Sequence, residues 1–156
     1  MANWLIGIHA FLGEFAVLAF LWVFIELFNP GKDTPSRLRI ISGLGLLFLL
    51  LAWVVGGYYY VSTYGSEVKP IILNGPDAWA HRLITEAKEH IFLLLPFLGM
   101  LIFSMIRFEG ESLRTDLKMR KAIQWLSLLV VLIGLSMAGM GYLISTGVRT
   151  ALEAGA

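Results

Sequence analysis

Four long apolar runs constrain this 156-residue chain more than any other feature of its sequence. With its flanks, each run is long enough to cross the hydrocarbon core of a bilayer, and the runs cover about residues 4–28, 40–63, 91–106 and 122–147. Hydrophobic residues make up 58% of the sequence, which leaves room for short connections but for no separate soluble domain. The sequence therefore predicts a single all-α integral membrane domain, an up-down-up-down four-helix bundle with helices at about 4–28, 38–63, 77–107 and 119–147.

Lys and Arg residues are distributed unevenly along the chain. Eight of the twelve lie between the first and second helices or between the third and fourth: Lys32, Arg37, Arg39, Arg107, Arg114, Lys118, Arg120 and Lys121. Cytoplasmic loops of membrane proteins carry this kind of excess. We therefore expect both connections in the cytoplasm and both termini on the outer, periplasmic side of a bacterial inner membrane, with membrane lipid as a partner and no nucleic acid.

The chain contains no cysteine, and this limits the chemistry that it can carry. It cannot form a disulfide, a thiolate zinc site, a cysteine-ligated iron–sulfur cluster or a thioether-linked haem. The sequence also lacks a phosphate-binding loop, a nucleophile elbow and a metal-hydrolase motif. We therefore expect a cofactor held by histidine, methionine, carboxylate or shape, and an electron-transfer component rather than an independent enzyme.

Two of the three histidines are candidates for such a site. His81 and His90 are nine residues apart, which places them on opposite faces of the third helix. His90 adjoins the apolar run and is expected to face the bundle, whereas His81 is expected at a solvated surface. The first and third helices of an up-down bundle are diagonal neighbours, so His9 and His90 should face one another at similar depth. Two facing imidazoles suit the iron of a b-type haem as axial ligands, and this is the preferred interpretation; the alternative is a pair of hydrogen-bonded polar residues near the interface.

Further residues near this expected site carry weaker signals. Gly13 and Gly56 leave space for a flat ligand, and Met140 can meet His9 or His90. Histidine with methionine is also the donor set of a copper site that lacks cysteine. Glu14 lies near the middle of the first span, where a carboxylate must be neutralised or paired. It can accept a hydrogen bond from a ligating histidine, transfer protons, contact a quinone, or simply bond as an acid to a serine such as Ser136.

Local signals add expectations that a structure can test. Pro96 should kink the third span, because it removes a backbone donor. Glu26 should pair with Arg37 or Arg39 at the cytoplasmic end. Residues 65–76 should form the longest outer loop, with Asp77 as the cap of the third helix. The tyrosines that precede this loop should form an interfacial aromatic belt at Tyr58, Tyr59, Tyr60 and Tyr64.

The first helix resembles the signature of a family of uncharacterised four-helix bacterial membrane proteins. The family's signature is a histidine, often followed by proline, with a second histidine five positions on and then Phe-Pro. The segment HAFLGEFA from His9 to Ala16 has the same spacing, with Glu14 in the second histidine's place and Ala10 and Ala16 where proline is common. Gly56-Gly57-Tyr58, His90 and Arg107 are similar to other features of the family. The resemblance implies redox work and a b-type haem, and the absent second histidine implies one haem rather than two.

These observations lead to one leading hypothesis and two alternatives. The leading hypothesis is a membrane-embedded b-type haem electron-transfer protein or subunit, with His9 and His90 as axial ligands, that links an outer-face redox partner to quinone or to another subunit. The first alternative is a non-catalytic accessory or anchoring subunit of a larger membrane complex. The second is a proton or metal-ion carrier that uses Glu14.

Overall fold

The computed structural model describes residues 4–155, and the described chain contains helices and no strands. Helices α1 and α2 are joined by a short turn, and α2 continues through the π-helical segment η1 into α3. A second turn leads to the π-helical segment η2, which continues into α4 and α5, and the 3-10 segment η3 precedes α6. The elements span Trp4–Glu26 (α1), Thr34–Tyr59 (α2), Tyr60–Val68 (η1), Lys69–Asn74 (α3), Ala80–Thr85 (η2), Glu86–Phe92 (α4), Leu94–Glu109 (α5), Gly110–Arg114 (η3) and Leu117–Glu153 (α6).

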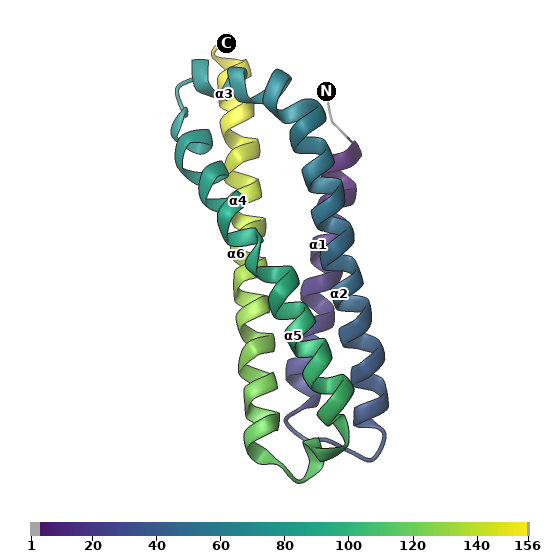
Figure 1. Cartoon of the computed structure of the whole chain (residues 1–156). Coiled ribbons are helices and arrows are strands. Elements are labelled where there is room, and N and C mark those ends of the chain that lie inside the picture. The colour runs from purple at the N-terminus through teal and green to yellow at the C-terminus, as the bar shows by residue number, and fades with distance from the viewer. Residues whose placement is uncertain (1–3, 156) are drawn as a thin grey trace.

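These elements form four long helical units that lie side by side (Figure 1). Each unit is long and apolar enough to cross a membrane: Trp4–Glu26, Thr34–Asn74, Ala80–Glu109 and Leu117–Glu153. The sequence-based prediction of a helical bundle with four membrane-spanning candidates is therefore confirmed. Both termini lie at one end of the bundle, called here the terminal end, and the connections 27–33 and 110–116 lie at the other, the hairpin end.

The helices pack through narrow apolar stripes. On α1 the buried residues are Ala16, Phe20 and Val23, whose spacing of four and three places them on one face. Leu27, in the turn directly after α1, continues this buried stripe. Helix α1 contacts α2 and α6, and α5 contacts the same two helices, so α1 and α5 are diagonal neighbours. The opposite face of α1 exposes large apolar side chains, as a surface that meets lipid requires.

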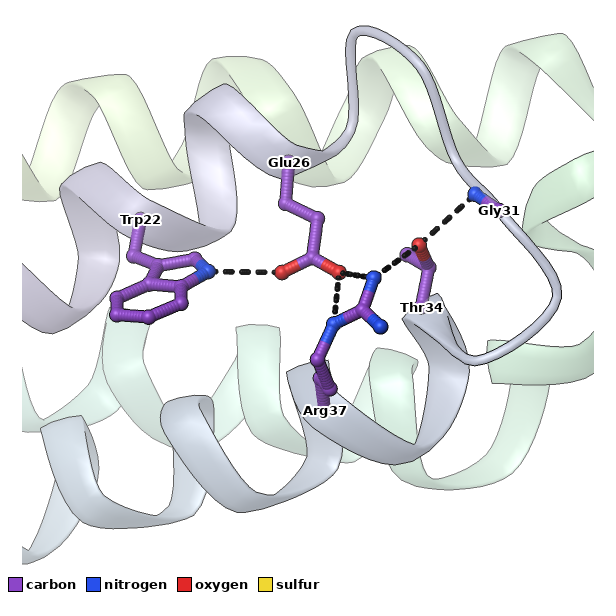
Figure 2. A network of polar contacts seen from close by, with 5 residues as sticks. All are labelled: Trp22, Glu26, Gly31, Thr34 and Arg37. Atoms are coloured by element: carbon purple, nitrogen blue, oxygen red, sulfur yellow. Dashed lines mark hydrogen bonds and ion pairs between the residues drawn. The ribbon is translucent and has the colours of Figure 1, made fainter.

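A polar network closes the turn between α1 and α2 at the hairpin end (Figure 2). The Glu26 carboxylate accepts hydrogen bonds from the Trp22 indole and from Nε of Arg37, both at 2.8 Å. Arg37 also donates to the Thr34 hydroxyl, which accepts a further bond from the backbone N–H of Gly31. The prediction that Glu26 pairs with Arg37 or Arg39 is confirmed for Arg37.

The second helical unit is longer than the sequence indicated. It was expected to end near residue 63 and to be followed by a loop over 65–76, but it remains helical as far as Asn74. Pro70 does not end this unit, because it lies in the first turn of α3, where proline is tolerated. The π-helical segment η1 precedes this turn and carries the chain through Gly65 and Ser66.

The ends of the other units also differ from expectation. Helix α6 runs from Leu117 to Glu153, beyond the expected 119–147, and the carboxylate of Asp116 caps it by accepting from two backbone N–H groups. Asp77 does not cap the third unit as predicted. Its carboxylate instead accepts a hydrogen bond from the indole of Trp79 at 3.0 Å, since the helix begins two to three residues later than expected.

Pro96 interrupts the third unit as predicted. The regular α-helix breaks at Leu93, between α4 and α5, because Pro96 has no N–H to donate to the carbonyl of Phe92 four residues earlier. Beyond this break α4 lies along α6 (Figure 1). The third unit therefore lies closer to α6 than to α2 at the terminal end.

Candidate functional site

A pocket of about 650 Å³ lies between the helices at the terminal end. Its volume is within the range of sites that hold small molecules and cofactors, about 300–1,000 Å³. All four helical units contribute to its lining, through residues such as His9, Gly56, Tyr60, Lys88 and Arg149. Aromatic rings and charged groups line the same space, so the pocket suits a ligand that is partly apolar and partly polar.

His9 enters this pocket from α1 with its ring fixed by a hydrogen bond. Its Nδ1 lies 2.9 Å from the carbonyl oxygen of Ala52. A carbonyl only accepts hydrogen bonds, so Nδ1 must carry a proton, and in the neutral ring the lone pair belongs to Nε2. The ring lies directly against Gly56, where a Cβ atom would be 2.7 Å from Nδ1, and packs edge-on against Phe92 with ring centroids 6.3 Å apart. Gly56 is thus required for the position of His9.

His90 does not enter the pocket, and the prediction that it faces the bundle is wrong. Its side chain is exposed, and its Nδ1 donates to the backbone carbonyl of Glu86 on the same helix at 2.7 Å. The stripe that faces the pocket has the spacing of one helix face: Thr85, Lys88, Glu89 and Phe92. His90 lies outside this stripe, although it adjoins the apolar run that suggested an inward position.

His81 was expected at a solvated surface, and this prediction is also wrong, because the residue is only 3% exposed. The hydroxyl of Tyr64 lies 3.0 Å from Nδ1 of His81 and 2.9 Å from Oγ1 of Thr85, whose own proton goes to the Ala80 carbonyl. The Tyr64 hydroxyl therefore donates to Thr85 and accepts from His81 Nδ1–H. The side chains of His81, Tyr64 and Thr85 thus form one buried series of hydrogen bonds that ends at the Ala80 carbonyl.

The helical continuation to Asn74 brings Tyr64 against His81, and this explains why both were misplaced from sequence. Tyr64 is buried, so it does not belong to an interfacial belt, whereas Tyr58 is exposed as that interpretation expects. Tyr60 stacks on Tyr64 with ring centroids 5.3 Å apart and lines the pocket beside it. Tyr59, Tyr60 and Tyr64 thus form one wall of the pocket, and only the exposed Tyr58 of the four fits the predicted belt.

Three charged residues that the sequence did not single out line the pocket. Neither Lys88 nor Arg149 has a hydrogen bond or ion pair within residues 4–155. Oε1 of Glu89 is buried without a partner, and the hydroxyl of Tyr60 lies beside the same carboxylate. Gly141 makes room for the ammonium group, since a Cβ atom there would be 3.3 Å from Nζ of Lys88. The three-and-four spacing from Thr85 to Phe92 was the signal that could have identified Lys88 and Glu89.

The remaining predicted site residues lie apart from this pocket. Glu14 is exposed and has no hydrogen bond or ion pair in the described part of the chain. Ser136, its suggested partner, donates instead to the carbonyl of Ile133. Gly13 has open space around it and does not line the pocket, and Met140 packs against the main hydrophobic core. Of the residues predicted for the site, the structure brings together His9 and Gly56.

The described residues offer little for a bare metal ion. Residues 4–155 contain no group of three or more His, Asp and Glu side chains that could bind one, and Met140 does not join His9 in the pocket. A haem supplies four nitrogen ligands of its own and needs only an axial donor from the protein. His9 can be that donor through Nε2, because metal-binding histidines commonly donate their other N–H to a backbone carbonyl.

Comparison with protein-family models, with curated proteins and with solved structures finds no match to this chain. The resemblance of its first helix to a family of bacterial membrane proteins therefore stays a prediction.

Proposed function

We propose that this protein is a membrane-embedded electron-transfer protein that holds one b-type haem in the terminal-end pocket, with His9 as an axial ligand. The observation that carries the proposal is the hydrogen bond from His9 Nδ1 to the carbonyl of Ala52. It fixes the orientation of the ring and leaves Nε2 as the nitrogen that can bind iron. When bound, the haem supplies one-electron chemistry.

The pocket lining fits a haem held through a single histidine. Trp53, Tyr60 and Phe92 offer aromatic surface to a flat macrocycle, and Gly57 faces open space where a side chain would otherwise project. The ammonium group of Lys88 and the guanidinium group of Arg149 can bind the two carboxylates that a haem carries. The exposed position of His90 does not fit a second histidine ligand, so the proposal differs from the bis-histidine arrangement that the sequence suggested.

The orientation of the protein in the membrane determines which partner can reach this pocket. Eight of the twelve Lys and Arg residues lie in the two connections or within six residues of them, so the positive-inside bias supports a cytoplasmic hairpin end. The pocket would then open near the periplasmic surface of a bacterial inner membrane. A redox partner at that surface would exchange electrons with the pocket, and quinone or another membrane subunit would be the second partner.

An optical spectrum tests the proposal. The protein is expressed with haem supplied, purified in detergent, and reduced with dithionite. We expect a Soret band and an α-band at about one haem per chain, their loss in His9→Ala, and their retention in His90→Ala. Circular dichroism of each variant checks that the helices remain folded. A folded wild-type protein without these bands, or a folded His90→Ala variant that loses haem as completely as His9→Ala, refutes the proposal.

The role of an accessory subunit in a larger membrane complex remains a second candidate, because Glu14 is exposed in the membrane-facing surface of α1. The geometry supports a proton or ion carrier less well. Glu14 does not line the pocket, and in the described chain it has no polar partner that would extend a path across the membrane.

A further inference from the structure

Glu14 carries an ionisable group at a depth where lipid offers it no partner. Helix α1 spans Trp4–Glu26, so at 1.5 Å per residue Glu14 lies roughly 15 Å from one end of the helix and roughly 18 Å from the other. Within residues 4–155 its carboxylate has no hydrogen bond or ion pair, and the side chain faces outward. Ionisable side chains at this depth usually face a protein partner or a water-filled cavity.

The surface around Glu14 is otherwise suited to lipid or to another helix. Phe11 and Leu18, one turn away on either side, are each 56% exposed. Gly7 and Ala10 are exposed too, and a Cβ atom at Gly7 would meet nothing within 4 Å. A second helix can therefore approach the backbone of α1 closely one to two turns from Glu14, on the same face.

We propose that this face of α1 binds a transmembrane helix of a different protein, and that this helix carries a Lys or Arg side chain at mid-membrane depth that pairs with Glu14. The argument is charge complementarity. A carboxylate in an apolar surface is stabilised by a cation that is buried with it, and transmembrane acids and bases commonly pair in this way.

A second copy of this chain lacks the required group. The exposed Lys and Arg side chains of the described chain lie close to the ends of the helical units. Six lie in the two connections or within six residues of them, and the other two lie at the start of the third unit and near the end of the fourth: Lys32, Arg37, Arg107, Arg114, Lys118 and Lys121, and then Arg82 and Arg149. Phe92 contacts His9, so the exposed His90 lies roughly 10 Å closer to the terminal end than Glu14. A copy in the same orientation would therefore place another Glu14, and no cation, at this depth.

Fluorescence energy transfer in phosphatidylcholine vesicles tests the proposal on the full-length protein. Because the chain has no cysteine, a donor dye can be attached at one site through Lys121→Cys at the hairpin end. The probe is a synthetic 23-residue Leu/Ala transmembrane helix with one central Lys and an acceptor dye, and its control has Leu at that position. We expect the Lys helix to bind about tenfold more tightly than the Leu helix.

Variants decide whether Glu14 is responsible. In Glu14→Leu the Lys helix should bind no better than the Leu helix, whereas Leu18→Ala, a change at an exposed neighbour on the same face, should preserve the difference. Equal binding of the two helices to the wild-type protein, or an unchanged preference in Glu14→Leu, overturns the proposal. Energy transfer between two labelled copies of the chain would also overturn the proposal if Glu14→Leu abolished it, because a second copy would then cover this face. None of these outcomes depends on whether haem is bound.

Discussion

Replacement of Gly56 by alanine should displace His9 from its position in the pocket. A Cβ atom at residue 56 would lie 2.7 Å from Nδ1 and 2.8 Å from Cε1 of the His9 ring, well inside the 3.4–4 Å of an ordinary contact. The ring must therefore rotate away, and the hydrogen bond from Nδ1 to the Ala52 carbonyl is then lost. Gly57→Ala is a matched control on the same helix, since a Cβ atom at that position would meet nothing within 4 Å.

The two substitutions should have opposite effects on the free energy of unfolding. In a helix interior, alanine in place of glycine stabilises by about 1 kcal/mol, and both variants gain this contribution. Only Gly56→Ala incurs overpacking, which costs about 1–3 kcal/mol, and the loss of a hydrogen bond worth about 1 kcal/mol. Gly56→Ala should therefore be less stable than Gly57→Ala by about 2–4 kcal/mol.

Two measurements on ligand-free protein in detergent check this prediction. Unfolding in sodium dodecyl sulfate, followed by circular dichroism, gives the difference in stability. The ¹⁵N NMR spectrum of histidine-labelled protein reports the proton on His9 Nδ1, and the chain has only three histidines to assign. Equal stability of the two variants together with unchanged His9 signals in Gly56→Ala would refute the close contact between residue 56 and the imidazole ring.

Two further predictions test the shape of the terminal end. Pro96→Ala restores a donor to the helix, and straightening a kink of about 20° should move residues some 20 Å away by on the order of 7 Å toward α1. Electron-spin distance measurements between labels on cysteines introduced at Ala10 and Leu83 should show the shortening, and an unchanged distance contradicts the assignment of the kink to proline. Tyr64→Phe removes a buried hydroxyl with two hydrogen bonds and should lower the free energy of unfolding by about 1–3 kcal/mol in thermal unfolding. Tyr58→Phe, at an exposed position, is the control and should leave the stability unchanged. Equal stabilities of the two variants would show that the hydrogen bonds of Tyr64 contribute nothing.

The main features of the fold were predictable because lipid imposes a simple rule on sequence. A membrane span needs about 20 apolar residues; three of the four runs reach this length, and the shorter run over 91–106 reaches it together with the helix that precedes it. The helix break near Pro96 and the pair of Glu26 with Arg37 were predictable for local reasons, a missing donor and opposite charges across a short turn. The helix from Tyr60 to Asn74 was not, because Gly, Ser and Pro usually mark loops and nothing in the sequence signals a π-helical segment.

The candidate site was harder to predict, because it depends on the rotation of each helix about its axis. Neighbouring residues of a helix are about 100° apart around its axis, so an error of one residue in the position assigned to the helix face decides which side chain enters the pocket. Lys88 and Glu89 line the pocket, whereas His90, the next residue, is exposed. Hydrophobicity gives little guidance here, since apolar side chains face both the core and the lipid in a membrane helix. His9 was identified because α1 is one regular helix, without the π-helical segment and the break that complicate the third unit.

The depth of the pocket follows from counting along three helices from their basic ends. A hydrocarbon layer of about 30 Å corresponds to about 20 helical residues. Counted from Arg39, Arg107 and Lys121 at the hairpin end, this distance reaches the level of Tyr59, Lys88 and Gly141, and all three line the pocket. The pocket would thus straddle the boundary between lipid and water, with His9 on the lipid side and Arg149 on the water side. A ligand with an apolar body and an anionic edge matches this arrangement, because its body can remain in the hydrocarbon layer while its charge meets Lys88 and Arg149 at the surface.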